Sequence, residues 1–238
     1  MTLPDAATLT RVIEATWPAA SVQEAGGWII RDGQGGGSRV SAATQITRDA
    51  DIGAAEDAIR ALSQTPLFMI REGDDALDQA LAQRGYTIKN PVVMLAAPLD
   101  VLTVQRPPPR ATFEVWPPLA AQREIWAEGG IGAGRLAVME RASCPKTTIL
   151  GRVGDHPAGT AYVGISEGYA MIHALEVHTD FRRNGLAVHM TVAAALWAQA
   201  LGAHTMTLVT TQANVASKSL YASLGMTVVG HYHYRIHG

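Results

Sequence analysis

One stretch constrains the fold of this chain more than any other: VHTDFRRNGLAVHM, at residues 177–190. An apolar, strand-like run, YAMIHALEV, leads into it. An alanine-rich run with apolar residues at helical spacing follows from about Leu186 to Leu201, and Gly202 is suited to end a helix. The order strand, basic glycine-containing loop, helix predicts an α/β fold in which the loop connects a sheet to a helix packed on it.

Short strands and helices are predicted on both sides of this loop. Downstream come a strand (TMTLVTT), a helix (NVASKSLYASLG) and a final strand (MTVVGHYHYRI). Upstream, two helices in 118–142 precede a three-strand meander over 147–178, with turns at HPAG and EG. The first part of the chain is predicted to be mixed α/β, with two strands around a glycine-rich turn in 26–45, helices at 51–64 and 74–85, and strands at 66–71 and 86–99.

A proline run, QRPPPR at 105–110, divides the chain. Proline fixes φ and removes a backbone donor, so this segment should be extended and lie outside any sheet. The division predicts an N-terminal domain at 1–104 and a C-terminal domain at 111–238, both of ordinary domain size.

Composition excludes several classes of protein. A formal net charge of −2 with 17% charged residues lacks the basic excess of a nucleic-acid-binding protein. No apolar run reaches the ~18 residues of a membrane span, and the first residues lack a secretory signal pattern. Cys144 is the only cysteine, which leaves no cysteine cluster for zinc and favours a reducing cytoplasm. We expect a cytoplasmic protein that binds no nucleic acid, membrane or metal; a homodimer stays open.

Two glycine motifs match known sites but sit in the wrong context. GAGRLA at 132–137 fits a dinucleotide fingerprint, which requires a strand before it, whereas a helix is predicted there. GISEG at 164–168 fits a nucleophile elbow around Ser166, which requires a helix after it, whereas a strand is predicted. A helix–helix connection and a hairpin turn are therefore the favoured interpretations.

A third motif, RRNGLA at 182–187, has the context that a phosphate site needs. The first turn of a helix has backbone N–H groups without internal partners, and the helix dipole favours an anion there. Gly185 allows close approach of a ligand, Ala187 keeps the first turn small, and Arg182 or Arg183 adds positive charge. Two arginines beside the positive end of a helix are unfavourable without an anion, so a ligand site is favoured over a basic helix start that binds nothing.

These residues resemble the central motif of the GNAT acetyltransferase superfamily, a strand followed by R/Q-x-x-G-x-G/A and a helix. A second family motif is similar to NVASKSLYASLGMTV, with Asn214, Ser217, Leu220, Tyr221 and Gly225. The resemblance covers about 147–236. It implies an α/β, tandem GNAT-like fold: a mixed, mostly antiparallel sheet flanked by helices, with splayed central strands in the C-terminal domain.

The N-terminal part resembles a degenerate copy of the same fold. Its equivalent loop, TQITRDADIGAA, contains Asp49 and Asp51 and lacks R-x-x-G-x-A. Because acidic residues repel pyrophosphate, this part is expected to have no cofactor site.

The resemblance implies acetyl-CoA as co-substrate. Its pyrophosphate would lie on the backbone N–H groups of 183–187, and its pantetheine arm would run beside the strand ending at Val177. The implied cofactor-binding residues are Val177, His178, Thr179, Arg182, Arg183, Asn184, Gly185, Leu186, Ala187, Asn214, Ser217 and Tyr221.

Two side chains are candidates for catalysis. Tyr221 matches the family's general acid, although its spacing also suits a core tyrosine. Glu176 is our candidate base, directly or through water, because alternation turns it away from Leu175 and Val177; a solvated carboxylate is the alternative. His178 shares the face of Glu176 and is a weaker candidate, whereas His173 is expected on the opposite face.

The expected function is direct acetyl transfer from acetyl-CoA to the amine of a small-molecule or amino-acid-like acceptor. A non-catalytic acyl-CoA-binding or regulatory protein is the alternative. His231 and His233 are too few ligands for a metal site and are better suited to line an acceptor pocket.

Overall fold

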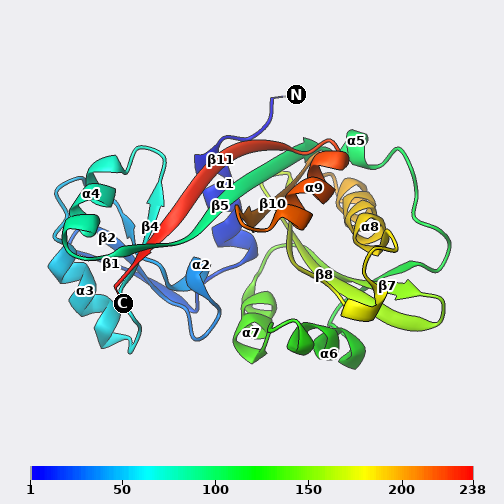
Figure 1. The fold of residues 1–238 in the computed structure, drawn as a ribbon, viewed down its shortest axis with the longest axis horizontal. Helices are drawn as coiled ribbons and strands as arrows, with labels where there is room; N and C mark the ends of the chain where they lie inside the picture. Colours follow the sequence, from blue (N-terminus) through cyan, green and yellow to red (C-terminus); the bar gives the residue numbers. More distant parts are fainter. Residues whose placement is uncertain (1, 238) are drawn as a thin grey trace.

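The computed structural model describes residues 2–237, which form one eight-stranded sheet and a smaller three-stranded sheet (Figure 1). The helices are α1 (Ala6–Thr16), α2 (Ser38–Ser41), α3 (Ile52–Ala61), α4 (Asp75–Gln83), α5 (Leu99–Leu102), α6 (Ala120–Glu128), α7 (Ala133–Arg141), the 3-10 helix η1 (Thr179–Phe181), α8 (Leu186–Ala200) and α9 (Val215–Ser223). The strands are β1 (Ser21–Ala25), β2 (Trp28–Asp32), β3 (Thr44–Gln45), β4 (Leu67–Arg71), β5 (Thr87–Pro98), β6 (Thr112–Val115), β7 (Lys146–Val153), β8 (His156–Ser166), β9 (Tyr169–Val177), β10 (Thr205–Thr211) and β11 (Thr227–Ile236).

The large sheet has the strand order β4-β11-β5-β10-β9-β8-β7-β6. Its neighbouring strands are antiparallel except β9 and β10, which are parallel and joined by the crossover helix α8. A parallel pair needs such a long connection, which the sequence supplies between Val177 and Thr205. The predicted mixed, mostly antiparallel sheet flanked by helices is confirmed.

Strand β5 joins the two parts of the chain within one sheet. It precedes the proline run, yet it lies between β10 and β11 and pairs antiparallel with both (Figure 1). Residues 105–110 form neither helix nor strand. The division into domains at this run stays a prediction, but the sheet continues across it.

Helices cover both faces of the sheet. Helix α8 lies against β7 and β9 on one face, and α1 and α6 lie against β8 and β9 on the other. Because α8 is apolar on nearly all sides, it is buried, and its alanines allow close packing on the strands. It ends at Ala200, one residue before the predicted end.

The segment predicted as two strands around a glycine-rich turn differs from expectation. Strand β1 lies earlier and was not predicted, and the second strand is replaced by the short helix α2 and the two-residue β3. The glycines serve close packing here: a Cβ on Gly36 would lie 2.5 Å from Val138 Cγ2, and one on Gly134 would lie 2.5 Å from the Gly35 carbonyl oxygen. The loop 33–37 is thus pressed against α7 instead of forming a hairpin.

The turn predicted at HPAG lies two residues earlier. β8 already begins at His156, and the chain reverses at Gly154, whose φ of +58° favours glycine. Pro157 therefore lies within the first residues of the strand, at the end of the ladder with β7.

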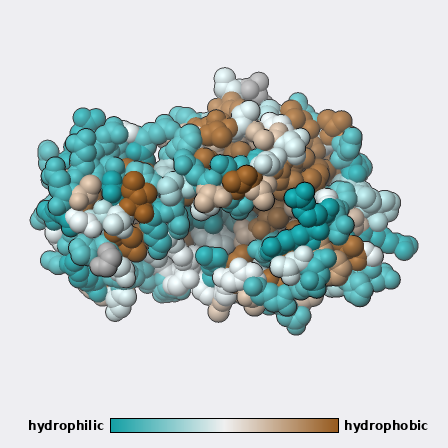
Figure 2. Space-filling view, in the orientation of Figure 1, coloured by the Kyte–Doolittle hydropathy of each residue, from teal (hydrophilic) through white to brown (hydrophobic). Residues whose placement is uncertain are grey.

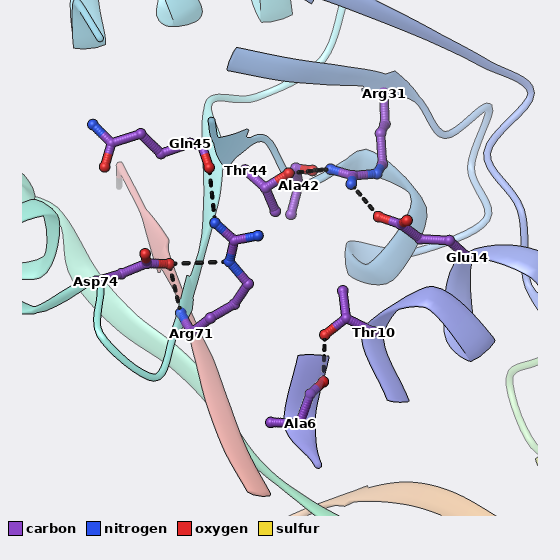
Figure 3. A network of polar contacts seen from close by, with 9 residues as sticks. All are labelled: Ala6, Thr10, Glu14, Arg31, Ala42, Thr44, Gln45, Arg71 and Asp74. Atoms are coloured by element: carbon purple, nitrogen blue, oxygen red, sulfur yellow. Dashed lines mark hydrogen bonds and ion pairs between the residues drawn. The ribbon is translucent and has the colours of Figure 1, made fainter. Parts of the chain in front are cut away.

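Two arginines anchor the small sheet to its surroundings (Figure 3). Arg31 of β2 donates to the Ala42 carbonyl and to Thr44 Oγ1, and it forms an ion pair with Glu14 of α1. Arg71 of β4 donates to the carboxylate of Asp74 and to the Gln45 carbonyl. These bonds tie α1, the small sheet and the edge of the large sheet together.

Within residues 2–237, no helix is long and apolar enough to cross a membrane.

Candidate functional site

The central strands β9 and β10 pair over only part of their length. Pairing joins 169–172 to 205–208, and both strands then continue unpaired with each other, to Val177 and Thr211. The cause lies in β9, where the register with β8 shifts and Ala174 has a φ of +51°. This bulge bends the strand. The Trp126 indole N–H donates to the Ala174 carbonyl oxygen at 2.7 Å and holds the bend.

The bulge also changes which side chains share a face. His173 pairs with Tyr162 and Glu176 pairs with Thr160, and these partners are two residues apart on β8. Because partners in a ladder point to the same face, His173 and Glu176 lie on the same face, the one that carries α1 and α6. The prediction that His173 faces away from Glu176 was wrong, since simple alternation does not survive an extra residue. Leu175 and Val177 pack on the α8 side, so Glu176 faces away from both of them, as expected.

The start of α8 is open to a ligand. Gly185 occupies the N-cap position in the left-handed region at φ +73°, and among the described residues no side chain caps it. Arg183 also has a positive φ of +69°. The first-turn N–H groups therefore lack helical partners, in an arrangement that suits an anion. The start of α3 is closed instead, because Asp51 Oδ1 accepts from the Gly53 N–H at 2.9 Å.

Arg182 and Glu176 are engaged with each other. Arg182 Nη2 lies 3.0 Å from Glu176 Oε1, and Arg182 Nε donates to the Val177 carbonyl oxygen at 3.0 Å. The Glu176 side chain packs on the end of α6, where a Cβ at Gly129 would lie 2.7 Å from Glu176 Cγ. The candidate base and one candidate phosphate ligand thus form one ion pair beside the end of β9.

Several other predicted cofactor-binding residues form hydrogen bonds within the protein, most of them with backbone groups. His178 Nδ1 accepts from the Asp180 N–H at 3.3 Å, and its Nε2 lies 3.2 Å from Glu128 Oε2 on α6. Asn214 Oδ1 accepts from the Ser217 N–H at 3.0 Å and caps α9. Asn184 donates to the Phe181 carbonyl oxygen at 3.3 Å. Contacts of these residues with a cofactor stay predictions, as do those of Thr179, Leu186 and Ala187.

Tyr221 lies in the core between α9 and α8. It is 4% exposed, and burial raises the pKa of its hydroxyl to about 12, partly opposed by a hydrogen bond with Thr191. Its hydroxyl is therefore protonated at neutral pH, as a proton donor must be. Its place in the core also fits the structural alternative that the sequence left open.

His173 has partners that the sequence did not predict. Arg39 Nη1 lies 2.8 Å from His173 Nδ1, and Thr16 Oγ1 lies 2.8 Å from His173 Nε2. Arginine only donates, so Nδ1 accepts and Nε2 carries the proton; Thr16 in turn donates to the Val12 carbonyl oxygen at 2.7 Å. Burial, followed by the charge of Arg39, holds the pKa of His173 well below its ordinary value. His173 is thus neutral and fully bonded, and it orients Arg39.

Two cavities adjoin this region. One of about 440 Å³ lies beside the first turns of α8, between α5, the proline run and the end of α9, where Figure 2 shows apolar residues gathered. A second of about 210 Å³ lies beside the end of β10 that is not paired with β9. Tyr232 and Tyr234 line this second cavity, whereas His231 and His233 line a different one with Asp78, whose Oδ1 is 2.7 Å from His233 Nε2.

The alternative motifs have the structures predicted for them. Gly132 begins α7 directly after α6, so GAGRLA is a helix–helix connection. Ser166 ends β8 before the turn into β9, so GISEG is a hairpin. Across residues 2–237, no three His, Cys, Asp or Glu side chains are grouped so that they could hold a metal ion.

Partly unpaired central strands and an open helix start behind one of them are the two structural features on which the predicted cofactor site depends. A model of the acetyltransferase (GNAT) family matches residues 107–226, and the chain belongs to this family. No curated protein matches the chain.

Solved structures share the fold. A GCN5-related N-acetyltransferase from Kribbella flavida matches with a TM-score of 0.73 and 18% identity, over 99% of this chain and 96% of that one. Another from Sphaerobacter thermophilus has a TM-score of 0.59 and 16% identity, over 82% and 71%. A tandem GNAT protein from the clavulanic acid biosynthesis pathway has a TM-score of 0.56 and 15% identity, over 76% and 66%. The architecture of both parts of the chain therefore recurs.

Proposed function

We propose that this protein is an acetyl-CoA-dependent N-acetyltransferase that acts on the amine of a small acceptor. The observation that carries the proposal is the separation of β9 from β10 directly before the uncapped, glycine-initiated start of α8. Unpaired strand ends offer backbone partners to an extended ligand, and the helix start offers N–H groups to a phosphate. Both lie inside the segment that the family model matches.

Different residues of the chain would bind different parts of acetyl-CoA. The backbone N–H groups of 183–187 would hold the pyrophosphate, helped by Arg182 or Arg183. The main chain at the end of β9, around Val177, would orient the acyl arm, and Asn214 and Ser217 would contact it from α9. Acetyl-CoA, when bound, supplies an acetyl group activated as a thioester.

Two proton movements are assigned to side chains. An amine acceptor with a pKa near ~10 must lose a proton before it reacts, and the Glu176 carboxylate would accept it, directly or through water. Glu176 is free to do so once Arg182 turns toward a bound phosphate. Tyr221, which is protonated at neutral pH, would donate its hydroxyl proton to the departing thiolate.

A second candidate is a non-catalytic acyl-CoA-binding or regulatory protein. The Glu176–Arg182 ion pair and the burial of Tyr221 favour it, because each engages a side chain that catalysis would need. Turnover with any amine acceptor would exclude it. We also propose a cytoplasmic location, because a chain with a single cysteine forms no internal disulfide and is typical of a reducing compartment.

The proposal is tested by calorimetric titration of acetyl-CoA against the wild type and Gly185→Glu. The substitution adds negative charge where the pyrophosphate would bind. We expect affinity to fall by at least about ten-fold, since one hydrogen bond to a charged group is worth about 1.5–3 kcal/mol. Gly202→Glu is the matched control, because Gly202 also has a positive φ, +83°, and no atom within 4 Å of an added Cβ. Equal affinity of both variants would reject the site.

A further inference from the structure

The 210 Å³ cavity lies where the N-terminal and C-terminal parts of the chain meet. The loop before α2 lies against α7 on one side, and the part of β10 that is not paired with β9 completes the lining together with residues of β5 and β11. The residues that line it are Gly36, Gly37, Ser38, Arg39, Asn90, Val92, Arg135, Val209, Thr210, Thr211, Tyr232 and Tyr234. This lining includes two arginines and no carboxylate.

Arg39 is held in place by neutral groups. Its guanidinium donates to the neutral ring of His173 and lies 5.0 Å from the centre of the Trp17 ring, which itself stacks on His173. Arg31 differs from Arg39 in this respect, because Arg31 forms an ion pair with the Glu14 carboxylate. A series of hydrogen bonds therefore orients Arg39 without neutralising its charge; it runs through His173 and Thr16 to the Val12 carbonyl oxygen.

Arg135 of α7 places a second positive charge beside the same loop. Its Nε would lie 3.6 Å from a Cβ on Gly37, so α7 and the glycine loop bring it to the same cavity as Arg39. Within residues 2–237, no carboxylate forms an ion pair with either arginine. Burial, and then the nearby charge of Arg39, lowers the pKa of Arg135.

The cavity lies on the opposite face of the sheet from α8. Tyr232, Tyr234 and Val92 belong to the core cluster under α1, whereas Leu186 at the start of α8 belongs to the cluster on the other face. The phosphate site proposed at 183–187 is thus separate from Arg39 and Arg135. Both sites adjoin the region where β9 and β10 separate, which is where an acceptor would meet the acyl group.

We infer that this cavity binds the acceptor, and that the acceptor carries an anionic group, a carboxylate or a phosphate, bound by Arg39 and Arg135. The two neighbouring guanidinium charges have no counter-ion, so binding of an anion between them is favourable. The planar guanidinium group can donate two parallel hydrogen bonds to a carboxylate or to a phosphate. The volume of about 210 Å³ is below the ~300 Å³ of ordinary ligand pockets, so the bound part is small. The inference rests on the proposed function and adds the substrate class.

Matched pairs of acceptors test the charge requirement. Initial rates of thiol release are measured with a panel of L-amino acids, the C-terminal amide of each, ethanolamine and O-phosphoethanolamine. We expect kcat/KM to be at least about ten-fold higher for the acid than for its amide, the usual size of one charged contact. Preference only for O-phosphoethanolamine over ethanolamine identifies phosphate as the anion. Equal rates within every pair, or turnover of uncharged amines alone, overturn the inference.

Variants assign the effect to the two arginines. Arg39→Gln keeps a donor for His173 but removes the charge, and Arg135→Gln removes the second charge. In each, KM for the anionic acceptor should rise by at least about ten-fold while KM for acetyl-CoA is unchanged, and Arg39→Lys should recover part of the loss. Arg60→Gln, on the exposed surface of α3, is the control and should change neither. Unchanged acceptor KM in both cavity variants overturns the assignment.

Titration of acetyl-CoA separates the two possible failures. If acetyl-CoA binds but anionic amines are not preferred, the anion site alone is rejected. The same holds if acetyl-CoA binds but no anionic amine is acetylated or bound. Absence of acetyl-CoA binding rejects the proposed function. In that case the acids of the panel are titrated by themselves, and binding that Arg39→Gln weakens supports the anion site, while no binding rejects it too.

Discussion

At the residue scale, the hydrogen-bond partners of His173 determine its protonation state. Arg39 can only donate to it, and Thr16 accepts from it, so the ring is neutral with its proton on Nε2. A histidine that looked structural in the sequence thus positions a charged side chain at a cavity. Nothing in the sequence pattern indicates this, because Thr16, Arg39 and His173 lie on α1, α2 and β9.

The depressed pKa of His173 predicts a pH-dependent stability. The unfolded chain takes up a proton near the ordinary value of 6.5 and the folded chain does not, so stability is lost as pH falls below about 6.5. The loss is at most about 1.4 kcal/mol per pH unit for this one group. His173→Gln, which can still accept from Arg39, should show a shallower fall in urea unfolding experiments. His156→Gln, at the exposed start of β8, should retain the wild-type slope.

Tyr221 carries a prediction about chemistry. If its hydroxyl protonates the departing thiolate, Tyr221→Phe should lower kcat by about 100-fold or more, within the usual range for a general acid, and leave the affinity for acetyl-CoA unchanged. The buried ring is retained, and only the hydroxyl with its hydrogen bond to Thr191 on α8 is lost. Steady-state kinetics and calorimetry check this. Unchanged turnover would leave Tyr221 as a core residue.

At the scale of elements, the bulge in β9 decides the shape of the site. It bends the strand away from β10, and it brings His173 and Glu176 to one face. Trp126 holds it from α6, so the strand and the helix determine the opening together. An alternating apolar sequence such as YAMIHALEV predicts a strand, but it contains no signal for an extra residue within it.

The positive φ of Ala174 makes the bulge testable. Ala174→Val places a β-branched residue in the left-handed region, where such side chains are strongly disfavoured, and should lower the free energy of unfolding by about 1–2 kcal/mol or more. Ala174→Gly removes the Cβ and should change it by less than about 1 kcal/mol, since relief of strain is offset by greater freedom of the unfolded chain. Equal effects of the two variants would contradict the assigned strain.

At the scale of the whole molecule, β5 makes the two parts interdependent. It pairs with β10 along seven registered positions and also with β11, while β11 pairs with β4. Removing the N-terminal part would leave the edges of β10 and β11 unpaired, and exposed edges of this kind promote aggregation.

We therefore expect residues 111–238 expressed alone to be insoluble or unfolded, and co-expression with 1–110 to restore a soluble complex. A protease site inserted into the exposed run 105–110 is the control, because cutting there breaks no strand pairing. Size-exclusion chromatography after cleavage should show both fragments in one complex. A stable, soluble monomer of 111–238 would show that β5 is dispensable.

The sequence by itself determined the class of fold and the order of most elements. Hydrophobic periodicity and glycine stops are local signals, and they sufficed for α3, α4, α6 to α9, β2, β4, β5 and β7 to β11. They did not predict α1, β1 or β6. Two motifs in the expected order were enough for the GNAT family, and local context correctly rejected GAGRLA and GISEG as sites.

Only the tertiary structure decided what surrounds the 210 Å³ cavity. The insertion of β5 between β10 and β11, the bulge at Ala174, and the meeting of Arg39 with Arg135 depend on pairing and packing between segments far apart in the chain. Such contacts are selected by shape and by the need to satisfy buried polar groups, which no local pattern records. The strand–loop–helix order around 182–187 could therefore be predicted from a short stretch of sequence, whereas the cavity on the other face of the sheet could not.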